Sequence, residues 1–214
     1  MKSFLKSVKS MIEIVLGVTG SIGAYKAADL VRRLREQDCA VTCVMTKEAR
    51  EFIAPLTLEV LSERPVYTDL FSGRDPHVVH TRLADQAKLV LIAPATANLI
   101  GKLAHGIADD LLTCLVLATK APLLLAPAMN VHMYHHPTVQ DNIRALRKLG
   151  HRFIGPAVGS LACGYEAIGH LAEVDEIVKA ALQLAAPGRQ SSPPARSSQA
   201  KATRRPSRAP KRRR

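Results

Sequence analysis

The chain has 214 residues, of which 47% are hydrophobic and only 4% aromatic, with no tryptophan, so any folded core must be aliphatic. No apolar run reaches the ~20 residues that a transmembrane helix requires, and residues 1–10 contain no apolar run of signal-peptide length. Four cysteines are too few for a disulfide framework. The composition therefore argues against a secreted, membrane-spanning or mainly disordered protein and predicts a cytoplasmic one.

The net charge of +12 is concentrated near the C-terminus. Ten of the 30 Lys and Arg residues fall in 188–214, which has no acidic residue, so residues 1–187 carry a net charge of only +2. We predict an N-terminal extension at 1–10, one folded domain at 11–186 and a disordered basic tail at 187–214. The tail has no aromatic residues for base stacking, so any nucleic-acid binding is expected to be weak and nonspecific.

Short apolar runs alternate with amphipathic stretches along the domain. Strands are expected, in chain order, at 12–18, 40–45, 89–93 and 123–126. Helices are expected at 24–34, 49–53, 56–61, 108–119, 139–149 and 174–184. The glycine-containing stretch 159–169 shows neither period, which is typical of an irregular flap. The alternation predicts a single α/β domain, a Rossmann-like, doubly wound parallel sheet with helices on both faces.

Glycine-rich or polar segments follow each predicted strand: 17–23, 46–47, 94–98 and 127–130. Carboxyl ends of parallel strands meet at one rim, where ligands bind in such sheets, so these segments are expected to form a small-molecule site. The first segment places small residues and a hydroxyl at a helix N-terminus, which favours a phosphate, although a tight strand-to-helix turn alone also explains its glycines. The cofactor-binding candidates are Gly20, Ser21, Ile22, Thr46, Thr96, Ala97 and Asn98.

The spacing of the glycine turn differs from the dinucleotide pattern G-x-G-x-x-G, and the second strand ends without an acid to bind a ribose. A mononucleotide such as FMN therefore fits better than NAD. Four segments then resemble one known family, the homo-oligomeric flavin-containing cysteine decarboxylases. They are LGVTGSIGAYKAADLVRRL (16–34), LIAPATANLIGKLAHGIADDLL (91–112), PAMNVHMY (127–134) and GSLACGYEAIGHL (159–171).

This resemblance implies a flavodoxin-like fold, FMN as cofactor, and trimers or trimer-based dodecamers with sites at subunit contacts. It also implies decarboxylation of 4′-phosphopantothenoylcysteine to 4′-phosphopantetheine in coenzyme A biosynthesis. In that reaction a thiol is oxidised to a thioaldehyde, CO2 is lost, and the enethiol is reduced again. The alternatives are a peptidyl-cysteine decarboxylase and a non-catalytic regulatory flavoprotein.

The resemblance also assigns roles to three residues. His80, in the pattern His-Thr-Arg-Leu, would move a proton near neutral pH, with His77 as its neighbouring competitor. Asn130 would bind the substrate carboxylate, and Cys163, in the flap, would donate a proton to the enethiolate carbon. The residues alone also allow a loop histidine, a turn or cap asparagine and an ordinary free cysteine.

Two flap residues depart from the family pattern: Ala167 stands where glycine is usual and His170 where arginine is. His170 weakens a fixed cation that could hold the substrate's phosphate or carboxylate. Among the remaining residues, Asp109 and Asp110 are interpreted as a helix cap or an intersubunit contact. Cys39, Cys43 and Cys114 are expected in the core, and no metal site is predicted at His132, His135 and His136.

Overall fold

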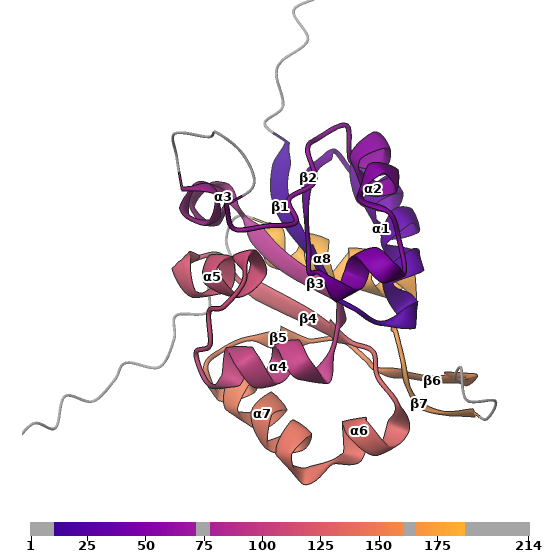
Figure 1. The fold of residues 1–214 in the computed structure, drawn as a ribbon. Helices are drawn as coiled ribbons and strands as arrows, with labels where there is room; N and C mark the ends of the chain where they lie inside the picture. Colours follow the sequence, from indigo (N-terminus) through magenta and orange to yellow (C-terminus); the bar gives the residue numbers. More distant parts are fainter. Residues whose placement is uncertain (1–10, 72–77, 161–165, 187–214) are drawn as a thin grey trace, which may run out of the picture.

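The computed structural model describes residues 11–71, 78–160 and 166–186. A five-stranded sheet lies at its centre, with all neighbouring strands parallel and the spatial order β2-β1-β3-β4-β5 (Figure 1). The strands are β1 (Ile12–Val18), β2 (Cys39–Met45), β3 (Leu89–Ala95), β4 (Leu123–Pro127) and β5 (Arg152–Phe153). The predicted doubly wound α/β class is confirmed, and the strand order reverses between β1 and β3, as in flavodoxin-like folds.

Ten helical segments lie within the described residues; nine fall between strands, and the tenth, α8, follows the last strand. They are η1 (Ile22–Lys26), α1 (Ala27–Glu36), η2 (Glu48–Glu51), α2 (Pro55–Ser62), α3 (Val79–Gln86), α4 (Ala97–Ala104), α5 (Leu111–Ala118), α6 (Val131–His135), α7 (Pro137–Lys148) and α8 (Val174–Ala185). Of the helices described, none is long and apolar enough to cross a membrane.

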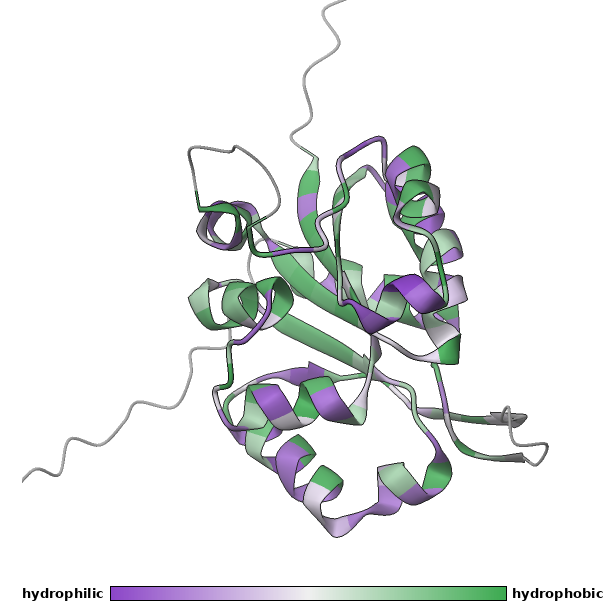
Figure 2. Cartoon of the chain, viewed as in Figure 1, coloured by the Kyte–Doolittle hydropathy of each residue, from purple (hydrophilic) through white to green (hydrophobic). Residues whose placement is uncertain are grey.

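The alternation of side chains along the strands builds two apolar layers, one on each face of the sheet. Ile14 and Leu16 of β1 belong to the cluster that includes α1 and α8, whereas Val15 belongs to the cluster that includes α3, α4, α5 and α7. Figure 2 shows apolar strands at the centre and hydrophilic residues on the helices around them. Because both faces are covered, the strands are apolar almost without interruption.

A separate pair of strands projects from the main sheet (Figure 1). β6 (Ala157–Ser160) and β7 (Glu166–His170) pair antiparallel, with Val158 opposite Ile168. The prediction of an irregular flap over 159–169 is therefore wrong for the described parts of this segment. The pattern is hard to recognise in the sequence because Val158 is 70% exposed and glycines interrupt both strands, so no apolar face alternates along the ribbon.

Some helix boundaries also differ from the prediction. The helix expected at 108–119 begins only at Leu111, because Asp110 caps it: the Asp110 carboxylate accepts a hydrogen bond from Thr113 N, and the Thr113 hydroxyl accepts one from Asp110 N. This confirms the interpretation of Asp110 as a cap. Helix α4 was not expected, since Pro94 and Gly101 obscure its short apolar pattern.

Candidate functional site

Two adjacent cavities lie at the carboxyl ends of the strands, where the strand order reverses. The larger cavity has a volume of about 530 Å³ and the smaller cavity about 270 Å³. Gly20, Ser21, Ala128 and Met129 line both of them. The predicted convergence of the segments that follow β1, β2, β3 and β4 is therefore present, and the combined space falls in the range of ordinary small-molecule sites.

Most of the predicted cofactor residues lie in the wall of the smaller cavity. These are Gly20, Ser21, Thr46, Thr96, Ala97 and Asn98. Ile22 instead lines the larger cavity, where its side chain is 62% exposed. The structure thus brings all seven residues to one rim and distributes them over the two adjacent cavities.

Thr19 joins two of these segments and was not among the predicted site residues. Its hydroxyl donates a hydrogen bond to the Pro94 carbonyl (2.8 Å) and accepts one from Thr96 N (3.1 Å). The residue is only 1% exposed, and it ties the turn after β1 to the start of α4. The sequence does not reveal this role, because a threonine in a glycine-containing turn gives no signal of a partner 75 residues away.

Two features of the smaller cavity fit a bound ligand. The Thr46 hydroxyl is buried and has no hydrogen-bond partner among the residues that the structure describes. A buried hydroxyl without a partner is costly, so a ligand atom within its reach would satisfy it. At Gly20, an added Cβ would lie 2.4 Å from the Glu48 Cβ, so only glycine allows the two turns this close approach.

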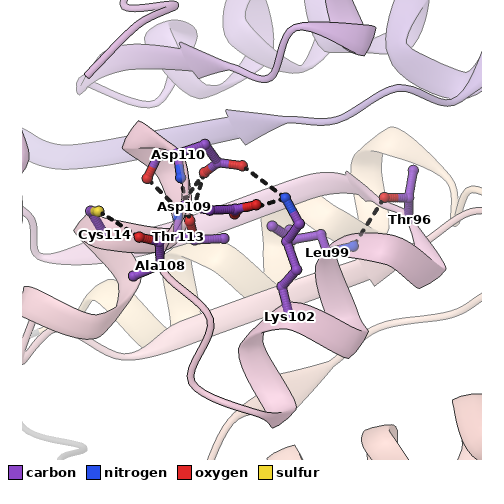
Figure 3. Close-up of polar contacts among 8 residues, drawn as sticks. All are labelled: Thr96, Leu99, Lys102, Ala108, Asp109, Asp110, Thr113 and Cys114. Carbon is purple, nitrogen blue, oxygen red and sulfur yellow. Dashed lines mark hydrogen bonds and ion pairs between the residues drawn. The ribbon is translucent and has the colours of Figure 1, made fainter. Parts of the chain in front are cut away.

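Lys102 crosses between two helices at the edge of the smaller cavity (Figure 3). Its ammonium lies 2.8 Å from an Asp109 oxygen and 3.6 Å from an Asp110 oxygen, which links α4 to the cap of α5. The hydrogen bond from Lys102 lowers the pKa of Asp109, and the same bond raises the pKa of Lys102. At the other end of α4, the Thr96 hydroxyl accepts a hydrogen bond from Leu99 N, so it caps the helix.

Asn130 lies in the wall of the larger cavity, at the N-cap of α6. Its Oδ1 accepts a hydrogen bond from His132 N at 2.8 Å, which fixes the side-chain amide. The preceding residue, Met129, donates its N–H to the carbonyl of Gly169 at 3.0 Å, so β7 is joined to the same loop. Asn130 therefore both caps α6 and lies beside the larger cavity.

His80 is not brought to either cavity within one chain. It is the second residue of α3, a helix that packs against α5, and its Nδ1 is buried without a hydrogen-bond partner among the described residues. Cys163 and His77 lie outside the described residues. The roles of His80, Asn130 and Cys163 therefore remain predictions.

The other cysteines divide into two kinds. Cys39 and Cys43 are buried on β2, which confirms the core interpretation, and burial raises the pKa of Cys43 to about 12. For Cys114 the expectation was wrong: it is half-buried on α5, and its Sγ lies 3.5 Å from the Ala108 carbonyl. The sequence of α5 does not reveal this exposure, because the helix is apolar on most faces and some of its apolar residues, such as Leu117, are themselves exposed. Among the described residues no cluster of three or more His, Cys, Asp or Glu can hold a metal ion.

Comparison with known proteins gives the class to which this fold and site belong. The Flavoprotein family matches residues 3–186, and the chain belongs to that family. The chain is 50% identical over 169 residues to the coenzyme A biosynthesis bifunctional protein CoaBC of Bacillus subtilis. The matched region covers 78% of this chain but only 42% of that protein, so the chain spans less than half the length of this relative. It is 47% identical over 170 residues to a probable phosphopantothenoylcysteine decarboxylase of Streptococcus mutans, covering 78% of the chain and 95% of that protein.

Solved structures agree with this placement. A variant of a PPC decarboxylase, complexed with pantothenoylaminoethenethiol, superposes with a TM-score of 0.73 at 32% identity, covering 79% of this chain and 96% of the other. The FMN-dependent cysteine decarboxylase SpaF gives a TM-score of 0.70 at 33% identity, covering 82% of this chain and 98% of the other. The resemblance seen in the sequence and the flavodoxin-like fold it implied are confirmed.

Proposed function

We propose that the protein is an FMN-dependent phosphopantothenoylcysteine decarboxylase, a carbon–carbon lyase of coenzyme A biosynthesis. The observation that carries the proposal is the pair of adjoining cavities: one is lined by the predicted cofactor residues, the other by Asn130, and they share a wall. A flavin and a substrate bound side by side in this way would be in contact for electron transfer. By their names, the Bacillus subtilis relative acts in coenzyme A biosynthesis and the Streptococcus mutans relative is a probable phosphopantothenoylcysteine decarboxylase. The two solved structures are named as a PPC decarboxylase and an FMN-dependent cysteine decarboxylase.

The residues that line the smaller cavity suit the binding of FMN. Gly20 lets the turns after β1 and β2, which both line this cavity, approach each other closely, and Thr46 offers a buried hydroxyl that lacks a described partner. Ser21 precedes η1 without capping it, so its hydroxyl also suits a phosphate oxygen. When bound, FMN would accept two electrons from the substrate thiol and later return them, so that no net oxidation takes place.

The protein's own residues would bind, orient and protonate. Asn130, which lines the larger cavity and whose Oδ1 accepts a hydrogen bond from His132 N, would bind the substrate carboxylate. A neutral amide orients the carboxylate without stabilising its charge as strongly as a cation, which favours loss of CO2 from the thioaldehyde. His80 would take up the thiol proton, and Cys163 would protonate the carbon of the enethiolate.

This assignment requires more than one copy of the chain, since His80 lines neither cavity of its own subunit. We propose a trimer or a trimer-based dodecamer, in which α3 of one subunit supplies His80 to the site of its neighbour. Co-expression of His80→Asn with Asn130→Asp chains tests this arrangement. Each variant alone would be inactive, whereas mixed oligomers would regain part of the activity because some sites would combine two intact residues. Mixed oligomers without activity would contradict a shared site.

The proposed setting is the cytoplasm, with the FMN-loaded homo-oligomer acting on a small-molecule substrate. Nucleic acid is expected to bind only weakly, through the basic residues of 188–214. Removal of those residues would then abolish binding to nucleic acid and leave decarboxylation intact.

The test of function compares the wild-type protein with His80→Asn, using anaerobic incubation with 4′-phosphopantothenoylcysteine. We expect CO2 release by the wild type and a fall of at least 10²-fold in the variant, the usual contribution of a general acid–base residue. Turnover of a cysteine-terminated peptide but not of this substrate would favour the peptidyl-cysteine alternative. Bound flavin without turnover of either would favour a regulatory flavoprotein.

A further inference from the structure

The position of His80 depends on how the first turn of α3 is held. No side chain caps this helix at its N-cap residue, Val78. The His80 Nδ1 is buried without a hydrogen-bond partner among the residues that the structure describes, so no described bond orients the imidazole through this atom. The placement of the ring therefore follows from the placement of the α3 backbone.

Arg82, in the same turn of α3, contacts a residue outside the helix. Its Nη2 donates a hydrogen bond to the Tyr67 hydroxyl at 3.0 Å, and its Cζ lies 5.7 Å from the centre of the Tyr67 ring. Both residues are half-buried. A hydrogen bond from a charged donor is about twice as strong as a neutral one, and partial burial strengthens it further. Arg82 can therefore fix the distance between this turn and Tyr67.

Tyr67 is itself bound to the central sheet. Its N–H donates a hydrogen bond to the Cys43 carbonyl at 3.0 Å, and its carbonyl accepts one from Met45 N at 2.8 Å. Cys43 and Met45 belong to the end of β2, and the next residue, Thr46, lines the smaller cavity. The bond between Arg82 and Tyr67 thus joins α3 to the strand that leads into the cofactor cavity.

The other contacts of α3 hold it less precisely at its start. The helix lies beside α5 (Figure 1), and Val79, Leu83 and Ala84 pack into the apolar layer that includes α5. Such apolar contacts are not directional, so they allow small shifts of the helix. The Thr119 hydroxyl donates a hydrogen bond to the Ala84 carbonyl at 2.9 Å, but this bond lies in the second half of α3. The hydrogen bond from Arg82 is a directional contact in the first half.

We propose that Arg82 is a positioning residue for His80. Through Tyr67 it holds the first turn of α3 at a fixed place relative to β2, and so it places the imidazole that α3 supplies to the neighbouring site. The inference rests on the proposed function, in which His80 takes up the proton of the substrate thiol. A misplacement of about 1 Å can lower a catalysed rate about 10²-fold, so a small shift of α3 matters. Arg82 itself lines neither cavity of its own subunit.

Steady-state kinetics of the FMN-loaded protein with 4′-phosphopantothenoylcysteine test this role. Tyr67→Phe removes one hydroxyl, Arg82→Met removes the donors but keeps an unbranched side chain, and the double variant combines them. The matched control is Arg32→Met, because Arg32 is an exposed arginine of α1 that bonds Asp29 of its own helix. His80→Asn is the reference for loss of the imidazole. A fluorescence titration with FMN shows for each protein whether the cofactor cavity is intact.

We expect kcat to fall about tenfold or more in Tyr67→Phe and in Arg82→Met. The KM and the FMN dissociation constant should stay within about twofold of the wild type, as should every constant of Arg32→Met. The double variant should lose no more than the larger single loss, because both substitutions break the same bond. Tyr67→Phe keeps the positive charge of Arg82, so equal losses exclude a purely electrostatic role of the guanidinium.

The pH profile of kcat separates a misplaced imidazole from a general weakening of the fold. A thiol with a pKa of about 8.5 is roughly 3% ionised at pH 7 and roughly 75% ionised at pH 9, so the base is needed less as the pH rises. The losses in Tyr67→Phe and Arg82→Met should therefore shrink at high pH, together with the loss in His80→Asn.

Three results would overturn the proposal: single variants with the kcat of the wild type, losses that multiply in the double variant, or losses that do not shrink at high pH. If Arg82→Met does not bind FMN, Tyr67→Phe decides the question, because it removes a hydroxyl and keeps the packing of the ring. A wild type without turnover would contradict the proposed function and overturn the inference with it. An active wild type with unaffected variants would overturn the inference alone.

Discussion

Replacing Thr19 by valine removes a single hydroxyl from the junction of two site-forming segments. Valine has nearly the same shape, so the packing is retained while two hydrogen bonds are lost, one to the Pro94 carbonyl and one from Thr96 N. Thr19 is 1% exposed, so the Pro94 carbonyl is left without this partner in the interior, whereas the half-buried Thr96 can recover part of its loss from water. Each unsatisfied buried group costs about 1–3 kcal/mol, and we expect a total destabilisation of about 2–3 kcal/mol.

The measurement is equilibrium unfolding in urea, followed by circular dichroism at one fixed protein concentration, with and without FMN. For a domain of this size the change corresponds to a fall in Tm of roughly 5–10 °C. The control is Thr57→Val at an exposed position of α2, where a change within about 0.5 kcal/mol is expected. The affinity for FMN should fall together with stability in Thr19→Val, because the start of α4 loses its anchor. A Thr19→Val protein as stable as its control would refute the role of this hydroxyl.

Three further predictions concern the cofactor cavity, a core thiol and a surface ion pair. Gly20→Ala should weaken FMN binding at least tenfold in a fluorescence titration, because its Cβ would lie 2.4 Å from the Glu48 Cβ; unchanged affinity would show that the turns can separate freely. Cys43, with its pKa raised to about 12, should resist alkylation at pH 8 until the protein is unfolded, as peptide mass spectrometry would reveal. In Lys102→Met, stability should fall at pH 7. The hydrogen bond from Lys102 lowers the pKa of Asp109 below its ordinary value of 3.8. The ion pair therefore stabilises the fold above pH 3.8, and this stabilisation is lost as the pH falls through the lowered pKa. A wild-type protein that stayed more stable than Lys102→Met in stronger acid would contradict this explanation.

The sequence predicted the sheet well because its signals are local. The strands around Ile14 and Leu91 are apolar runs interrupted by a single charged residue, Glu13, as expected of strands buried on both faces. The convergence at the rim followed from topology alone, since parallel strands must end on the same side. The residues predicted there lie around the two cavities for that reason.

The features that were missed depend on contacts between distant segments. Nothing local marks Thr19 as the residue that joins two turns, or Arg82 as the partner of Tyr67. The β6–β7 ribbon is hard to recognise because Val158 is exposed and glycines interrupt both strands, so the alternation that identifies strands is lost. Cys114 was expected to be buried because a helix that is apolar on most faces gives no sign of which face remains exposed.

The activity proposed for this flavoprotein is decarboxylation of a phosphorylated pantothenoylcysteine. The most direct measurement is mass spectrometry of 4′-phosphopantothenoylcysteine after anaerobic incubation with the purified, FMN-reconstituted full chain, alongside a visible spectrum of the protein. We expect a flavin spectrum and conversion of the substrate to 4′-phosphopantetheine with loss of one CO2. A protein that cannot be reconstituted with FMN, or a flavin-loaded protein that leaves this substrate unchanged, would contradict it.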